Sequence, residues 1–315
     1  MTQFDHSTTG REVVSAFSDK VSGRTFVITG ASHGGIGAHV ALCLAAAHPA
    51  EILLLGRSQD KIDPVIKEIQ AISPATKVKF IKVDLASSDS VRAAAKEVAS
   101  TVSKIDVLIN NAGIMAPKYS ITSDNVESQF GANYVGHFLL TNLLVPQLEA
   151  ASNGARVVNV SSLMYQFSPV QFDDYNFSNS TPFNTWEAYG QSKTANILFA
   201  VTCAEKLASK GIKSYSLHPG NIQATKLAAT IDPAEWPVVM KLFEEKQIEM
   251  PRTKTIEEGS STTLAAALDP ELDAFSGAFL DDCHPKKPLD YASDPTNGKK
   301  LWALTEKILG ENFSY

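Results

Sequence analysis

A glycine-rich turn between a strand-like and a helix-like segment constrains the fold more than any other feature of the chain. Residues 25–29 (TFVIT) are apolar and β-branched, residues 30–37 (GASHGGIG) contain four glycines, and residues 35–48 form a mostly apolar segment of helical length. A strand, a glycine turn and a helix in this order allow the backbone to approach a pyrophosphate at a helix N-terminus. The motif predicts an α/β domain that binds a dinucleotide; the alternative is a tight turn without a ligand.

Alternating strand and helix patterns continue through the rest of the chain. The other predicted strands are residues 52–56, 78–83, 105–109, 156–161 and 212–217. The other predicted helices are residues 59–72, 88–103, 123–149 (bent or ended early by Pro146) and 186–210. Near-continuous apolar runs are typical of parallel strands covered on both faces. We therefore expect a single-domain Rossmann-type α/β fold, a doubly wound parallel sheet with helices on both faces.

Two long segments interrupt this alternation. Residues 163–185 and 223–255 are rich in aromatic residues, proline and polar residues. Loops of this length in a compact domain usually form lids or binding walls. We expect an N-terminal arm at residues 1–20, one domain at 21–315, and both insertions on its substrate side.

Charge and cysteine content exclude several classes of protein. The chain of 315 residues has 28 basic and 34 acidic side chains, for a net charge of −6, and no basic stripe that would bind nucleic acid. Its apolar stretches are too short for a membrane span, and its start does not resemble a secretion signal. Cys43, Cys203 and Cys283 are an odd number without close pairing. These features favour a cytoplasmic protein without nucleic-acid or membrane partners.

Polar residues at the predicted strand ends are candidates for cofactor contacts. Arg57 follows the second strand, and no Asp or Glu occupies residues 55–58. An acidic residue there would bind a ribose 2′-hydroxyl, whereas an arginine accommodates a 2′-phosphate, so the sequence favours NADP(H) over NAD(H). The alternative is a solvated surface arginine. Asp84 and the Asn110–Gly113 segment follow the third and fourth strands, where caps are the alternative interpretation.

Tyr189 and Lys193 are four residues apart, so a helix would place both on one face. A neighbouring ammonium favours the phenolate, which suits a tyrosine for acid–base catalysis. Ser161 and Ser162 end the fifth strand, where a hydroxyl would donate to a substrate carbonyl or serve as a cap. Asn133 lies within a predicted helix, in which asparagine is a mediocre former. The Asp281–His284 segment has metal-ligand residue types but no second cluster, so no metal is expected.

Taken together, these motifs resemble the short-chain dehydrogenase/reductase family over about residues 20–310. The resemblance is carried by TGASHGGIG at 29–37, NNAG at 110–113, Asn133, the VSS that ends at Ser162, YGQSK at 189–193 and HPG at 218–220. FGANYVGHFLLTNLL, SKTANILFA and GKKLWALTEKILG are similar to the retinol-dehydrogenase-like branch, which includes the oxidoreductase domain of the WW-domain oxidoreductase. We expect a soluble member of this branch without a WW domain.

The resemblance implies a catalytic tetrad of Asn133, Ser162, Tyr189 and Lys193. Tyr189 would exchange the proton with the substrate oxygen, Ser162 would orient that oxygen, Lys193 would hold the nicotinamide ribose, and Asn133 would support a proton-relaying water. The implied cofactor contacts are Gly30, Ser32, His33, Gly35, Ile36, Gly37, Arg57, Asp84, Leu85, Asn111, Ala112, Gly113, Tyr189, Lys193, Pro219, Gly220, Ile222 and Thr225. One departure is the spacing from Gly30 to Gly35, which holds one residue more than the family's usual turn.

The activity expected from these residues is NADPH-dependent reduction of a ketone or aldehyde, reversible as oxidation of an alcohol. The expected substrate is apolar and of aromatic, terpenoid or polyketide type, held by Met164, Tyr165, Phe183 and Trp186 within a wider set that includes Phe167, Phe172, Trp236 and Phe243. The alternatives are a cofactor-binding scaffold or sensor, and an isomerase or cyclase on the same fold. For assembly, the family suggests a homodimer or homotetramer through the helices at 123–149 and 186–210, with a monomer as the alternative.

Overall fold

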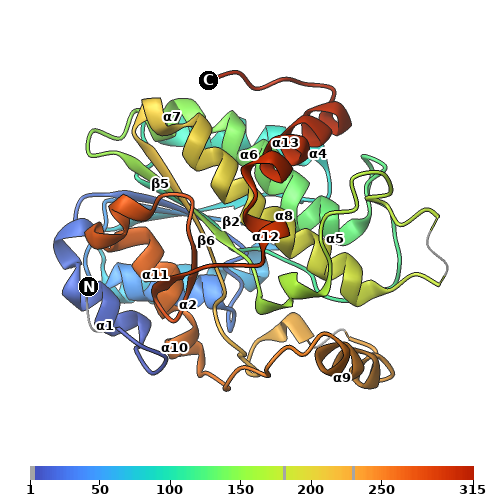
Figure 1. The fold of residues 1–315 in the computed structure, drawn as a ribbon. Coiled ribbons are helices and arrows are strands. Elements are labelled where there is room, and N and C mark those ends of the chain that lie inside the picture. The colour runs from blue at the N-terminus through green and yellow to red at the C-terminus, as the bar shows by residue number, and fades with distance from the viewer. Residues whose placement is uncertain (1–3, 180–181, 229–230) are drawn as a thin grey trace.

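The computed structural model describes residues 4–179, 182–228 and 231–315, and within them eight strands form one sheet (Figure 1). The strand order is β3-β2-β1-β4-β5-β6-β7-β8. Neighbouring strands from β1 to β7 pair in parallel, and β8 is antiparallel to β7. The strands are β1 (Thr25–Thr29), β2 (Glu51–Gly56), β3 (Lys77–Lys82), β4 (Val107–Asn110), β5 (Ala155–Val160), β6 (Ile212–Leu217), β7 (Phe279–Asp281) and β8 (His284–Lys286).

The doubly wound α/β sheet predicted from the sequence is confirmed. All six predicted strands are present, and the ends differ from the prediction by at most two residues. The strand order reverses between β1 and β4, which are neighbours in the sheet although β2 and β3 separate them in the chain. In open α/β sheets the ligand lies beyond the carboxyl ends of the strands at such a reversal. The fold therefore places the expected site beyond Thr29 and Asn110.

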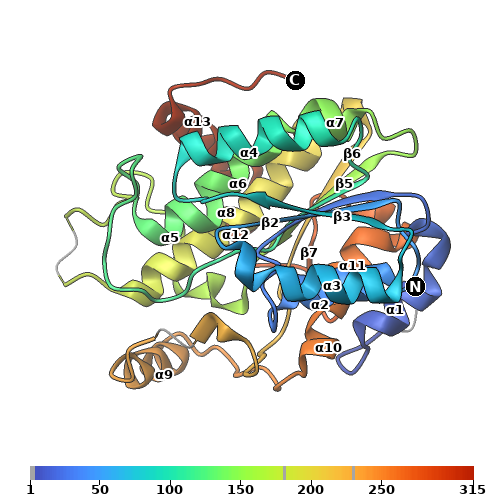
Figure 2. The same cartoon turned by 180° about the vertical axis from the view of Figure 1, so that it is seen from behind.

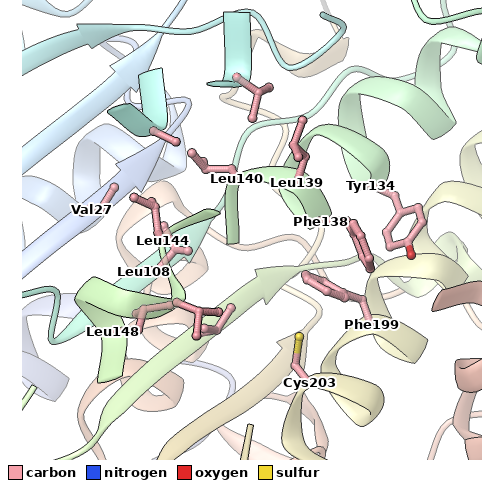
Figure 3. Packing of buried hydrophobic residues seen from close by; sticks show 14 of the residues in the cluster. Val27, Leu108, Tyr134, Phe138, Leu139, Leu140, Leu144, Leu148, Phe199 and Cys203 are labelled. Atoms are coloured by element: carbon pink, nitrogen blue, oxygen red, sulfur yellow. The ribbon is translucent and has the colours of Figure 1, made fainter. Parts of the chain in front are cut away.

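One face of the sheet is covered by α4 (Ser88–Thr101), α6 (Gly136–Leu143), α8 (Thr185–Lys206) and α13 (Pro295–Leu309) (Figures 1 and 2). The short helices α5 (Ser128–Phe130) and α7 (Val145–Glu149) flank α6, and α12 (Asp290–Ser293) packs on α8. Aromatic rings join these helices, since the ring of Phe138 lies 5.4 Å from that of Phe199 and 4.7 Å from that of Trp302. Figure 3 shows Phe138 and Phe199 within this core.

The opposite face is covered by α1 (Gly10–Ala16), α2 (Ile36–Ala45), α3 (Asp63–Ile72) and α11 (Ser261–Leu268), with α10 (Ile256–Gly259) beside them. The N-terminal region expected as an arm thus contains a helix that packs on α11. The Thr9 hydroxyl accepts from the Glu12 N–H, while the Glu12 carboxylate accepts from the Thr9 N–H, a reciprocal cap that begins α1. Val13 and Val14 are buried beneath it.

The prediction of one long helix over residues 123–149 is wrong for its first part, and the second part is divided into several helical segments. Ile121 forms a β-bridge with Glu127, so the helix begins only at Ser128. The Glu127 carboxylate accepts from two N–H groups at that start and caps it. A π-helical turn, η3 (Gly131–Val135), then precedes α6, and Pro146 stands in the first turn of α7, as the expected break there suggested.

The two insertions contain short helical elements. The first contains the 3₁₀ turn η4 (Leu163–Phe167), and the second contains η6 (Lys226–Ala228) and α9 (Glu235–Glu245). Figure 1 shows α9 at the lower edge, apart from the helices on either face. The remaining 3₁₀ turns are η1 (Ser18–Lys20), η2 (Gln59–Lys61), η5 (Ala208–Lys210) and η7 (Pro270–Phe275). In the part of the chain described, no helix has the length and apolar character to cross a bilayer.

Candidate active site

Tyr189 and Lys193 lie one turn apart on α8 and face the end of β5. The Lys193 ammonium lies 5.4 Å from the centre of the Tyr189 ring and donates a 3.1 Å hydrogen bond to the carbonyl oxygen of Val160. Each residue is 3% exposed. Because Val160 is the last residue of β5, this bond ties the helix to the strand that delivers Ser162.

The two serines after β5 have different tasks. Ser161 is buried and donates a 2.7 Å hydrogen bond to the backbone carbonyl of Lys193, so it holds α8 in place. Ser162 caps η4 by accepting from the Met164 N–H, and its side chain lies close enough to Tyr189 to lower the pKa of the phenol. The structure thus places Ser162, and not its neighbour, beside the phenol, at the position that the family resemblance implies.

Asn133 joins the site from the π-helical turn η3. Its side chain accepts from the Ile114 N–H at 2.8 Å and donates to the Ile114 carbonyl at 3.0 Å, and it also donates to Ser192. Gly113 lies between this side chain and the catalytic lysine, because a Cβ there would be 3.3 Å from Asn133 Oδ1 and 3.5 Å from Lys193 Nζ. A residue with a side chain at position 113 would therefore press on both groups. All four predicted catalytic residues meet around this point.

Burial shifts the pKa of Lys193 and of Tyr189, the two titratable residues of the tetrad. Removal from water disfavours the charged form of each group. Burial lowers the pKa of Lys193 to about 8. Burial also raises the pKa of Tyr189 above its ordinary value, and the hydrogen bond with Ser162 opposes that rise. The site therefore holds an amine that is readily neutralised beside a phenol that keeps its proton.

The glycine turn after β1 has the form of a dinucleotide site. A Cβ at Gly30, where φ is +72°, would lie 2.7 Å from the Cα of Ala112, and a Cβ at Gly37 would lie 2.5 Å from the Asn111 side chain. Only glycine permits this close packing of the turn against the end of β4. Gly35 begins α2 without a side-chain cap, so the N–H groups of its first turn are available to an anion. These features fit the pyrophosphate of a dinucleotide.

The turn accommodates its additional residue through its own backbone conformation. Gly34 adopts a φ of +79°, and the Gly35 N–H bonds the carbonyl of Ser32, which closes a tight turn before α2. The His33 N–H bonds the carbonyl of Lys61, so the enlarged turn is held against η2. The imidazole of His33 is largely exposed and lies 3.5 Å from the Glu68 carboxylate. A carboxylate at that distance does not favour the expected contact of His33 with a phosphate.

The ends of β2 and β3 carry the residues expected around the adenosine. Arg57 follows β2 directly and is exposed. Asp84 follows β3, and one of its carboxylate oxygens accepts from the Ala86 N–H at 3.0 Å. The backbone carbonyl of Leu85 packs closely against Gly136 of α6, where a side chain would clash. The bond from the Ala86 N–H closes a turn in the loop, and Ser87, not Asp84, caps α4, so the alternative interpretation of Asp84 as a helix cap is wrong.

The segment after β6 is supported by a lysine that the sequence did not single out. The side chain of Lys254 lies against Gly220, where φ is +105° and a Cβ would be 2.6 Å from Lys254 Cδ. The Lys254 ammonium is buried and pairs with the Asp282 carboxylate. His218 Nδ1 accepts from the Leu163 N–H, which links this segment to the loop that follows Ser162. No local pattern marks Lys254, because its partners come from distant parts of the chain.

Met164 and Trp186 form part of an apolar wall beside Tyr189. They belong to a cluster with Phe167 of η4 and with Val239, Leu242 and Phe243 of α9. Trp186 is fully buried, and its indole N–H donates to the Glu235 carboxylate at 3.1 Å. The second insertion is thereby attached to α8 three residues before Tyr189. Trp236, on the outer side of α9, is 44% exposed.

Tyr165 and Phe183, two of the expected substrate contacts, lie elsewhere. Tyr165 is buried against Phe279 of β7, and its hydroxyl accepts from the Leu289 N–H. It supports the sheet edge and does not join the cluster around Trp186. Phe183 packs on Tyr119, with ring centres 4.8 Å apart, and on Phe177. The expectation for Tyr165 is corrected, because alternate residues of η4 point to opposite sides. Phe183 lies outside η4, in the loop before α8, and its ring packs on aromatic rings of other loops.

The fold and the site define a Rossmann-type oxidoreductase, in which a glycine turn and an Asn-Ser-Tyr-Lys group meet where the strand order reverses. Residues 24–236 match the family model described as short chain dehydrogenase. The protein belongs to the short-chain dehydrogenase/reductase family, whose members use NAD(H) or NADP(H).

Relatives cover nearly the whole chain. The chain is 36% identical to the short-chain dehydrogenase/reductase prx1 of Penicillium roqueforti over 305 residues, which span 92% of this chain and 86% of the relative. It is 35% identical to human retinol dehydrogenase 11 over 291 residues, with coverages of 92% and 87%. The similarity to the retinol-dehydrogenase-like branch is thus confirmed.

Solved structures agree with the fold. An uncharacterised protein from Mycobacterium paratuberculosis is 32% identical, with a TM-score of 0.72 and coverage of 94% of this chain and 97% of that one. An NADPH-bound carbonyl reductase from chicken fatty liver has a TM-score of 0.59 at 21% identity, with coverages of 83% and 97%. At that identity the second likeness concerns the architecture alone.

Proposed function

We propose that the protein is an NADPH-dependent carbonyl reductase, reversible as an alcohol dehydrogenase, for apolar ketones or aldehydes. The observation that carries this proposal is that the Lys193 ammonium lies 5.4 Å from the centre of the Tyr189 ring, with both side chains buried and the Ser162 side chain beside the phenol. A scaffold or sensor has no need for an acid–base group with a dedicated hydroxyl partner and a buried cation. The grouping supports catalysis at a carbonyl.

When bound, NADPH supplies the hydride that reduces the carbonyl carbon. Tyr189 donates its phenol proton to the carbonyl oxygen as the carbon is reduced, and Ser162 donates a hydrogen bond to the same oxygen. Lys193 favours the phenolate that is left, because an ammonium close by stabilises a negative charge in a buried site. In the reverse direction the phenolate accepts the alcohol proton. Asn133 keeps Ile114 and Ser192 in place on either side of this group.

Arg57 supports the choice of NADPH over NADH. It stands directly after β2, where the adenosine ribose is held in this fold, and no carboxylate occupies residues 55–58. A guanidinium can bond a phosphate through two parallel N–H groups. The uncapped first turn of α2 supplies N–H donors for the pyrophosphate. We place the 2′-phosphate beside Arg57 on these grounds.

The partly exposed Met164, at the edge of the buried apolar cluster around Trp186 and Phe167, supports an apolar substrate. Ligand sites bury most of a small molecule against apolar and aromatic side chains, and a few polar groups orient it. Here Tyr189 and Ser162 are those polar groups. The name of the human relative, retinol dehydrogenase 11, indicates an apolar alcohol as its substrate, which agrees in chemical class. We propose a compound of aromatic, terpenoid or polyketide type.

The test is NADPH consumption over a panel of bulky apolar and small polar ketones and aldehydes, with Tyr189→Phe measured in parallel. We expect turnover of bulky apolar compounds, and a loss of at least about 10³-fold in kcat in the variant with NADPH binding retained. Tyr215→Phe is the matched control, because Tyr215 is also buried but lies in β6 and donates to the Leu272 carbonyl of η7. NADPH binding without turnover of any panel member would contradict the proposed activity and favour a scaffold or a non-redox reaction.

A further inference from the structure

His137 connects the cofactor turn with the catalytic helix. Its Nε2 lies 2.9 Å from the hydroxyl oxygen of Thr29, the last residue of β1, and its Nδ1 lies 2.9 Å from the backbone carbonyl oxygen of Asn133. The imidazole is 1% exposed and lies one turn beyond Asn133, at the start of α6. A buried histidine with both nitrogens engaged is more than a space-filling side chain.

The partners of His137 define the direction of each hydrogen bond. The Asn133 carbonyl can only accept, so Nδ1 carries the proton and Nε2 accepts from the Thr29 hydroxyl. The Thr29 oxygen in turn accepts from the N–H groups of Asn111 and Ala112, each at 3.0 Å. One chain of donors therefore runs from the end of β4 through Thr29 and His137 to Asn133.

The chain requires a neutral imidazole. A second ring proton would leave Nε2 and the Thr29 hydroxyl as opposed donors. Burial lowers the pKa of His137 to about 4, and the positive charge of Lys193 acts in the same direction. The other neighbours that bond the ring are the Thr29 hydroxyl and the Asn133 carbonyl, neither of which is charged. The ring thus stays neutral at physiological pH.

Both ends of the chain adjoin the groups that would handle the cofactor. Asn111 and Ala112 pack against Gly37 and Gly30 of the glycine turn. At the other end, the Asn133 carbonyl lies in a π-helical turn, a local widening of the helix that is common at functional sites. The Asn133 side chain contacts Ser192, beside Lys193. A displacement of the glycine turn would therefore be transmitted to Asn133, and a displacement of Asn133 to the glycine turn.

We propose that His137 is a positioning residue: it holds the helical turn that contains Asn133 in a fixed position relative to the glycine turn that follows Thr29. The bond to Asn133 maintains the geometry of the tetrad, and the bond to Thr29 maintains the end of β4 beneath the cofactor. Loss of the first would lower kcat, and loss of the second would weaken NADPH binding. The kcat part rests on the reductase function proposed above, whereas the binding part does not.

The two bonds can be separated by substitution. His137→Phe removes both, while His137→Asn keeps the one to Asn133, since an asparagine amide on this helix already donates to a carbonyl four residues back, from Asn142 to Phe138. Thr29→Val removes the other bond. Phe138→Leu is the control, because Phe138 is equally buried in α6 but touches only the aromatic core.

We would measure kcat, the NADPH Kd by fluorescence titration, and the melting temperature for each variant. We expect His137→Phe to lose about 10- to 100-fold in kcat and to weaken NADPH binding about fivefold or more. His137→Asn should recover most of kcat but bind NADPH more weakly than wild type, and Thr29→Val, which also removes the acceptor of the Asn111 and Ala112 N–H groups, should bind it more weakly still. The double variant should be no worse than Thr29→Val, because the bond to His137 is already lost in that variant. Phe138→Leu should lower the melting temperature alone.

Wild-type kcat and Kd in His137→Phe would overturn the proposal, as would a kcat in His137→Asn no better than in His137→Phe. If His137→Phe does not fold, His137→Asn, Thr29→Val and their double variant decide the question, and additive losses of NADPH affinity would refute the shared bond. If the wild-type protein reduces no carbonyl, the reductase proposal fails by itself. The Kd comparison then still supports or overturns the link between His137 and Thr29.

Discussion

The ammonium of Lys193 lies 5.4 Å from the centre of the Tyr189 ring, and neither side chain is more than 3% exposed. Burial lowers the pKa of Lys193 to about 8 and raises that of Tyr189, so water exclusion works against the charged form of each. In the proposed reaction Tyr189 would become a phenolate beside the Lys193 ammonium, and the two opposite charges would stabilise each other. The protein keeps a group at this position that costs stability, as functional sites often do.

Replacement of Lys193 by methionine should stabilise the protein while it abolishes turnover. The folded-state pKa of about 8, against 10.5 as the ordinary value, means that the cost of the buried charge is fully present below pH 8. That cost disappears as the pH rises through 10.5, where the unfolded chain also loses the proton. Linkage gives about 3 kcal/mol as an upper bound at pH 7. Urea unfolding at pH 7 and pH 10 should show a gain for Lys193→Met that shrinks with pH.

Lys299→Met serves as the control for that experiment, because Lys299 forms an exposed ion pair with Glu205. Exposed pairs contribute little to stability. We expect this control to unfold within about 0.5 kcal/mol of the wild-type protein. A Lys193→Met variant less stable than wild type at pH 7 would show that the ammonium gains more from the Val160 carbonyl than burial costs it.

Cofactor preference should depend on Arg57. Arg57→Ala would remove the proposed partner of the 2′-phosphate, and charge-assisted hydrogen bonds contribute about 1.5–3 kcal/mol. We therefore expect about a tenfold or greater rise in the Kd for NADPH with little change for NADH. Arg24→Ala is the matched control, since Arg24 precedes β1 at the opposite edge of the sheet. Equal losses for both nucleotides would contradict the assignment of Arg57 to the phosphate.

Acid should destabilise the protein through its buried histidines. Burial lowers the pKa of both His137 and His218 from 6.5 to about 4, so the unfolded chain takes up protons first as the pH falls. The stability that depends on each neutral ring is complete above pH 6.5 and is lost as the pH falls through 4. Linkage gives about 2 kcal/mol for each ring between pH 7 and pH 5. His137→Asn should lose about 2 kcal/mol less than wild type over that interval in urea unfolding, and an identical loss would contradict this account.

Much of the sheet could be predicted because each parallel strand is specified locally. Residues 25–29 (TFVIT) are β-branched or aromatic along their whole length, and residues 212–217 (IKSYSL) begin and end with apolar residues; the observed strands have those bounds. Tyr189 and Lys193 were also within reach of sequence analysis, since they share a helix face, whereas the choice of Ser162 and Asn133 as their partners needed the resemblance to a family. The strands and the pair of Tyr189 and Lys193 need only the periodicity of one element and the common edge at which parallel strands end.

The rest depends on partners far apart in the chain. The helix pattern after residue 123 did not reveal that Ile121 pairs with Glu127 and delays the helix. Tyr165 resembles a substrate contact until its hydroxyl is seen to accept from the Leu289 N–H, 124 residues away. His137 lies in an apolar helix pattern that gives no sign of its bond to Thr29, 108 residues earlier. Tertiary packing alone determines these contacts.

Contacts between distant parts of the chain also bear on assembly. The C-terminal helix α13 covers α6 and α8, which belong to the regions through which a dimer was expected. The Trp302 ring lies 4.7 Å from Phe138 of α6 and 6.2 Å from Phe199 of α8, and the Lys206 amine lies 4.8 Å from its centre. Pairing through α6 and α8 would require α13 to leave this position. We propose that the protein is a monomer, in which α13 occupies the face that another subunit would use.

Light scattering during size-exclusion chromatography should therefore give the mass of one chain, 33.9 kDa. Trp302→Ala should cost about 3–5 kcal/mol of unfolding free energy, because it opens a cavity between α13, α6 and α8, and should promote self-association. Trp236→Ala is the control, since Trp236 is 44% exposed on α9 and should cost less than about 1 kcal/mol. A stable dimer of the wild-type protein that contains α13 in place, with a mass unchanged in Trp302→Ala, would contradict this role of the C-terminal helix.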